Sequence, residues 1–204
     1  MGIKRLCLVP SDAEDVPVDL RALLASLREI GFMADAFESY DETHYSPGAD
    51  FLRLVHFYDS HPIIRLKQVN GEFVEDEIID SRNACSISFA EVTLTPEFLG
   101  GACSIAPLCP KCGYSEEAWP DMLSAWYPQK SEHRWVCPNC QVSQRVYNLD
   151  WQHAAALGRF RIIIDSIAYG EAVPTGDLLD SLHRTSGFLW DYYYYDDNPA
   201  NERW

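Results

Sequence analysis

Two short cysteine motifs constrain this chain more than any other feature. The first, Cys-Pro-Lys-Cys, spans residues 109–112, and the second, Cys-Pro-Asn-Cys, spans residues 137–140. Two sulfurs three positions apart reach one ion only if the backbone between them turns tightly, and the proline favours such a turn by fixing φ. Gly113 tolerates the left-handed conformation that ends the turn. The spacing therefore predicts one tetrahedral, closed and hence structural metal site. Its predicted ligands are Cys109, Cys112, Cys137 and Cys140.

The two motifs resemble the paired knuckles of the zinc-ribbon family, over about residues 106–150. This resemblance implies one structural zinc ion and a local shape, but not an activity. It also implies β-hairpins, with strands at 134–136 and 142–147 on either side of the second knuckle. The stretch 114–133 between the knuckles is long enough for a short helix. Cadmium, cobalt or iron are chemically able to replace zinc, and a redox dithiol is the alternative interpretation of each motif.

The charge of the chain bears on its partners. Its 204 residues carry 31 acidic and 16 basic side chains, a net charge of −15. Such a surface repels phosphate backbones, which argues against sequence-independent binding of nucleic acid. It suits either simple solubility or an acidic face that meets a basic protein.

The apolar segments indicate where the protein resides. No apolar run reaches the roughly 18 residues of a membrane-spanning helix, so no membrane association is expected. The first apolar stretch is too short for the core of a signal peptide. Seven cysteines, four of them in CxxC pairs, suit a reducing compartment. A cytoplasmic location is therefore expected.

The hydrophobic pattern predicts an α+β fold with a mixed or antiparallel sheet and two main helices. The four-cysteine region that resembles a zinc ribbon is expected to be inserted into this fold. The helices are expected at 20–31 and 174–187, each closed by a glycine. Strands are expected at 3–9, 51–58, 85–94, 159–169 and 188–195, with a hairpin around Asn70-Gly71 and a loop at 37–50. Residues 1–105 and 151–204 together are expected to form one α+β domain, with residues 106–150 inserted as the zinc ribbon.

A second site is suggested by His56, Asp59 and His61. Histidine and aspartate are common metal ligands and acid–base groups. On a continuous strand the two histidines would point to opposite faces, so a turn is needed to bring them together. Solvent-exposed histidines at a loop end are the simpler interpretation.

An aromatic run near the end of the chain suggests a partner-binding surface at Trp190, Tyr192 and Tyr194, with a plain aromatic strand as the alternative. The leading hypothesis is a protein-binding or regulatory module without enzymatic activity, in its most specific form an acidic, immunity-like inhibitor of a basic protein. A small-ligand-binding protein or enzyme that uses the region 56–61 is the alternative. Nucleic-acid binding through the ribbon comes third, since only Lys111, Lys130, Arg134 and Arg145 would supply positive charge there.

Overall fold

A central antiparallel sheet organises the protein. The computed structural model describes residues 4–39, 42–58, 85–101, 105–130 and 132–196. The sheet has six strands in the order β12-β1-β10-β5-β3-β2, and each neighbouring pair is antiparallel. Its strands are β1 (Lys4–Pro10), β2 (Met33–Ser39), β3 (Glu42–Pro47), β5 (Ile87–Phe89), β10 (Ile162–Asp165) and β12 (Trp190–Asp196). The protein is therefore α+β, as the sequence predicts.

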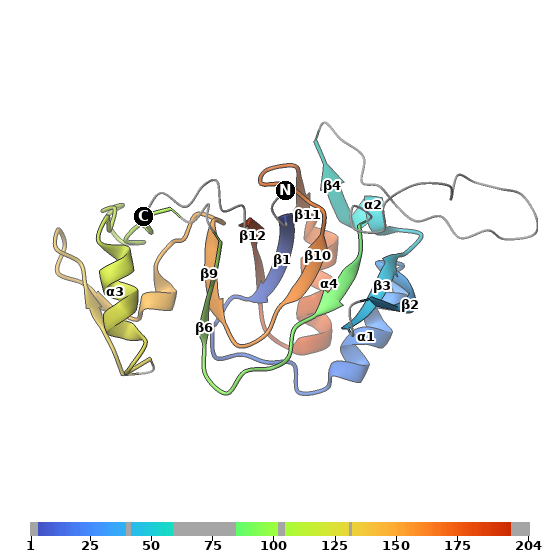
Figure 1. Cartoon of the computed structure of the whole chain (residues 1–204), viewed down its shortest axis with the longest axis horizontal. Coiled ribbons are helices and arrows are strands. Elements are labelled where there is room, and N and C mark those ends of the chain that lie inside the picture. Colours follow the sequence, from blue (N-terminus) through green and yellow to red (C-terminus); the bar gives the residue numbers. More distant parts are fainter. Residues whose placement is uncertain (1–3, 40–41, 59–84, 102–104, 131, 197–204) are drawn as a thin grey trace, which may run out of the picture.

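Two helices, α1 (Leu20–Glu29) and α4 (Gly176–Ser186), cover one face of this sheet (Figure 1). Asp19 caps α1 by accepting a hydrogen bond from the Ala22 amide at 3.0 Å, and Gly31 ends it with a φ of 71°. Gly187 ends α4 in the same left-handed conformation. Both predicted helices are confirmed, because leucines at helical spacing bury one side of each against the sheet.

Alternation along the strands gives the sheet two different faces. In β1, Leu6 and Leu8 lie in the core under the helices, while Cys7 and Val9 face the opposite side. That opposite side is covered by a two-stranded ladder of β6 (Glu97–Gly100) and β9 (Ala155–Gly158). Leu99 of β6 packs against the sheet.

The outer side of the β6–β9 ladder meets the cysteine-containing region. Phe98 and Leu157 pack there with Trp119 and Trp151 in a separate hydrophobic cluster. This region contains α3 (Trp119–Trp126), β7 (Trp135–Val136), β8 (Ser143–Gln144) and the 3₁₀ turn η2 (Val146–Asn148). Figure 1 shows the resulting layers, from the region with α3 through β6 and β9 and the central sheet to the helices. The predicted domain boundaries at 106 and 150 stay a prediction, although this cluster draws residues from both sides of them.

Two predicted elements are wrong, and the strand predicted at 142–147 ends at Gln144, before the 3₁₀ turn η2. The segment 37–50 is not a loop, because β2 and β3 pair through it and form the sheet edge opposite β12. The strands were not predicted because the segment is mostly polar. Only one side of an edge hairpin meets the core, so few apolar residues mark it in the sequence. The segment 51–58 is not one strand either, because it begins with a helical turn, α2 (Phe51–Leu54), before β4 (Val55–Phe57). The hairpin expected around Asn70-Gly71 lies outside the described residues.

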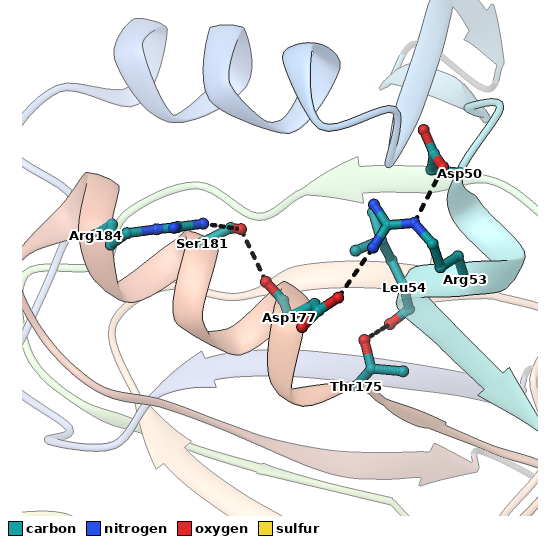
Figure 2. Close-up of polar contacts among 7 residues, drawn as sticks. All are labelled: Asp50, Arg53, Leu54, Thr175, Asp177, Ser181 and Arg184. Carbon is teal, nitrogen blue, oxygen red and sulfur yellow. Dashed lines mark hydrogen bonds and ion pairs between the residues drawn. The ribbon is translucent and has the colours of Figure 1, made fainter.

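A set of polar contacts joins α2 to the start of α4 (Figure 2). The Arg53 guanidinium donates to Asp50 Oδ1 at 3.1 Å and to Asp177 Oδ2 at 3.0 Å. The Thr175 hydroxyl donates to the Leu54 carbonyl at 3.0 Å. β4 then pairs with β11 (Ala172–Pro174) in a short antiparallel ladder. The start of β4 is thereby held near the start of α4, since Val55 pairs with Pro174.

Candidate functional site

The four predicted cysteine ligands converge. The sulfurs of Cys109, Cys112, Cys137 and Cys140 all lie within 4.8 Å of one another. The Cys109 and Cys140 sulfurs are 3.8 Å apart, and those of Cys112 and Cys137 are 3.6 Å apart. Four thiolates about 2.3 Å from a shared zinc ion have sulfurs about 3.8 Å apart in tetrahedral geometry. The cluster is therefore compatible with a metal ion, and no second convergent group of this kind lies within the described residues.

The two knuckles repeat one backbone arrangement. In the first, the Gly113 amide donates to the Cys109 carbonyl at 2.8 Å, and the Cys109 amide donates to the Tyr114 carbonyl at 2.8 Å. The second repeats both hydrogen bonds at 2.9 Å with Gln141, Cys137 and Val142 in the equivalent places. Gly113 and Gln141 hold left-handed φ angles of 70° and 58°. These turns point both sulfurs of each motif to the same side.

A buried carboxylate joins the pieces around the cluster. Glu116 accepts a hydrogen bond from the Trp135 indole N–H at 2.8 Å and another from the Ala118 amide at 3.1 Å. The first contact links the segment just before α3 to β7, and β7 leads directly into Cys137. The second satisfies the amide of the residue that caps α3. The sequence pattern gave no sign of this role for Glu116.

The ionisation of the thiols also favours a bound cation. Hydrogen bonds from the Asn139 side chain and the Tyr114 backbone lower the pKa of Cys112 to about 6. The Val142 amide lowers the pKa of Cys140, but desolvation and the neighbouring sulfurs together raise it to about 11. Neighbouring thiols resist full ionisation because each thiolate repels the next, and a divalent cation removes that repulsion.

The predicted second site is only partly described. His56 is exposed on β4, where it pairs with Val173 of β11. Its ring meets the Tyr58 ring edge to face, with the two centroids 5.2 Å apart. Asp59 and His61 lie outside the described residues. A shared site for these three side chains stays a prediction.

The predicted partner-binding residues differ in how exposed they are. Trp190 and Tyr194 are each only 6% exposed and belong to the core under the helices, because alternation in β12 points them inward. Tyr192 also points to that side but is half-buried. Partner binding at these three residues stays a prediction, and Tyr192 is the most accessible of them.

The structure gathers other aromatic side chains around Tyr192, which the sequence pattern did not reveal. The rings of Tyr169 and Tyr194 are in contact, with their centroids 4.8 Å apart. The His153 ring stacks on the Tyr192 ring, with centroids 4.1 Å apart and an angle of 5° between the ring planes. Burial, followed by the proximity of Tyr58, Asp191 and Tyr169, raises the pKa of Tyr192. We call the exposed part of this group, formed by Tyr58, Tyr169, Tyr192 and His153, the tyrosine face.

The tyrosine face combines rings with negative charge. Tyr58 and Tyr169 are 58% and 54% exposed. Asp191 lies at its edge, with Oδ1 3.6 Å from His153 Nδ1. Exposed rings of this size that retain a polar tip are typical of protein-binding surfaces.

The basic residues of the cysteine-containing region are partly occupied. Lys130 lies over the rings of Trp126 and Tyr127, at 5.7 and 5.5 Å from their centroids. Arg145 lies over Tyr147 and donates to its hydroxyl. Lys111 and Arg134 are exposed. The four therefore do not form an unoccupied basic surface.

Among the described residues, no helix has the length and apolar character needed to cross a lipid bilayer. Comparisons with models of protein families, with curated proteins and with solved structures found no match. The function of the chain has to be inferred from its own residues.

Proposed function

We propose that this chain is a non-enzymatic protein-binding module in which a structural zinc ion supports a region next to an acidic, tyrosine-rich surface. The zinc would be held by Cys109, Cys112, Cys137 and Cys140 in a ribbon-like arrangement. Four thiolates leave no open coordination position, so the ion would supply stability rather than catalysis. The sulfur separations of 3.6 and 3.8 Å support this assignment.

The partner we propose is a basic protein. The observation that carries this proposal is the tyrosine face, where exposed rings lie beside Asp191 on a molecule of net charge −15. Tyrosine provides a large contact area with few rotatable bonds, and its ring attracts lysine and arginine. Charge of this sign accelerates encounter with a basic surface and repels acidic competitors.

Affinity capture from native lysate with a matched pair of variants tests this function. The bait is the wild-type protein, the triple variant Tyr58→Ser/Tyr169→Ser/Tyr192→Ser, or the control Tyr127→Ser, which removes an exposed tyrosine from the end of α3. We expect one basic protein to be retained by the wild type and by the control, to elute with salt, and to be lost from the triple variant. Equal retention by all three baits, or no specific retention, would contradict the proposal.

A further inference from the structure

A small pocket opens beside the tyrosine face, where the cysteine-containing region meets the central sheet. Its volume is about 120 Å³. The end of β1, the loop 149–153, the strand β9 and the start of β12 surround it. Tyr192 and His153 belong both to this pocket and to the tyrosine face. A group that enters the pocket would therefore also contact that face.

An unusual loop shapes the pocket. Gln152 and His153 are consecutive and both left-handed, with φ angles of 52° and 58°. Asp150 holds this turn by accepting from the Gln152 amide at 2.8 Å, and the Gln152 side chain donates to the Ala106 carbonyl at 3.1 Å. Conformations of this kind cost free energy in residues other than glycine, and they persist because these contacts fix them.

His153 closes the outer edge of β12. Its carbonyl accepts from the Tyr194 amide at 2.8 Å, and its Nδ1 lies 2.8 Å from the Tyr192 carbonyl. Since a carbonyl only accepts, Nδ1 must carry the hydrogen, so the neutral ring has Nε2 as an acceptor.

The ionisable groups around the pocket favour a cation. Asp150 and Asp191 line it, and no lysine or arginine is among its lining residues. Each carboxylate uses Oδ1 for a nearby backbone amide, Gln152 for Asp150 and Tyr192 for Asp191. A carboxylate accepts about four hydrogen bonds, so acceptor capacity remains on both. Trp151, Tyr192 and Tyr147, whose ring lies under Arg145, also line it.

We propose that this pocket receives an arginine side chain of the basic partner, an inference that rests on the proposed function and names its recognition chemistry. A guanidinium presents five N–H donors in a planar fork, which matches two carboxylates and a histidine nitrogen, and it stacks on aromatic rings. A lysine ammonium is a point charge that stacks less well. Arginine is also among the residues that most often dominate binding energy at interfaces.

An NMR titration tests the pocket without knowledge of the partner. The probe is Nα-acetyl-L-arginine methylamide, added to the ¹⁵N-labelled 204-residue protein in about 0.15 M salt. The control probe is the citrulline analogue, which has nearly the same shape but no charge. We expect saturable shifts at the amides of 150–153 and 191–192 with the arginine probe, and at least five-fold weaker binding of citrulline. Equal binding of both probes, or shifts spread over the acidic surface, would overturn the inference.

Two variants test whether the carboxylates of the pocket bind the arginine probe. Asp150→Asn/Asp191→Asn removes both charges but keeps an oxygen acceptor at each position, and we expect it to weaken binding of the arginine probe at least five-fold. Glu29→Gln removes an exposed charge at the end of α1 and should leave binding unchanged. If the double variant does not fold, the comparison of arginine and citrulline binding to the wild type still tests whether the pocket binds a guanidinium.

Failure here is distinguishable from failure of the proposed function. Capture of a basic partner that depends on the tyrosines, with no arginine site in the titration, would overturn the pocket and keep the function. An arginine site in the titration without any captured basic partner would support the pocket and contradict the function.

Discussion

At the scale of single residues, the two knuckles differ at the position that follows the second cysteine. Gly113 and Gln141 both hold left-handed backbone, but only glycine does so without strain. A Cβ on Gly113 would meet nothing within 4 Å, so the backbone conformation is the only obstacle to a side chain there. Gln141 offsets its strain in part, because its side chain donates to the Pro138 carbonyl at 3.0 Å.

Gly113→Ala should therefore weaken metal binding by the cost of the left-handed conformation. That cost is about 1 kcal/mol, or about five-fold in affinity. Competition with a chromophoric chelator measures it. Gly176→Ala is the control, since that position also has open space but no positive φ. Equal metal affinity of the wild type and Gly113→Ala would show that the left-handed conformation at residue 113 does not affect metal binding.

The other buried thiols allow a prediction about pH. Desolvation raises the pKa of Cys7 to about 11 and that of Cys85 to about 12, from an ordinary value of 9.0. Folding thus favours the protonated thiols, and their contribution to stability is complete below pH 9 and is lost as pH rises through 11 to 12.

We expect the free energy of unfolding to fall by a few kcal/mol between pH 9 and pH 11, since one pKa unit is worth about 1.4 kcal/mol per group. Urea denaturation at both pH values measures the loss. The double variant Cys7→Ala/Cys85→Ala should lose less over the same interval. An identical pH dependence in the variant would assign the loss to other groups.

At the scale of elements, the edge strand β12 depends on His153. The His153 side chain and carbonyl occupy the hydrogen-bonding positions that a neighbouring strand would take, which protects an edge otherwise open to unwanted pairing. His153→Gly keeps the backbone conformation accessible but removes the ring and its hydrogen bond to Tyr192.

In His153→Gly, loss of this hydrogen bond costs about 1 kcal/mol, and relief of the left-handed backbone offsets about as much, so we expect little change in global stability and a local effect at the edge of β12. Hydrogen exchange at the Tyr194 amide should become faster in the variant. Exchange in β10, in the middle of the sheet, should stay slow and serves as the internal control. Unchanged protection at Tyr194 would mean that His153 does not hold this edge.

The elements show what the sequence was able to predict. Leucine spacing and terminal glycines fixed α1 and α4 almost to the residue, and the CPxC motifs located the four converging sulfurs. The hairpin β2–β3 was missed because it lies at the sheet edge and its pattern is mostly polar. The left-handed turn at 152–153 was missed because glutamine and histidine rarely adopt it, and long-range contacts impose it.

At the scale of the whole molecule, two separate hydrophobic clusters lie on opposite sides of the β6–β9 ladder and the sheet. Four of the six tryptophans belong to the cluster beside the cysteines. They are Trp119, Trp126, Trp135 and Trp151. The core under α1 and α4 contains Trp190.

Metal removal should therefore affect one side of the molecule first. We expect a chelator under reducing conditions to shift tryptophan emission to longer wavelength, because the cluster beside the cysteines loosens and its indoles meet water. Hydrogen exchange in the core strands β1 and β10 should stay slow. Loss of metal without any change in emission would mean that the ion does not support this cluster.

Native mass spectrometry of the protein purified without added chelator tests whether the four cysteines hold one metal ion. Wild-type protein should carry one zinc ion per chain, and Cys112→Ser, which removes an exposed ligand without disturbing the core, should carry less than half an equivalent. The Cys85→Ala control removes a buried thiol outside the cluster and should keep the ion. Metal-free wild type, or a Cys112→Ser variant that retains a full equivalent, would contradict the claim.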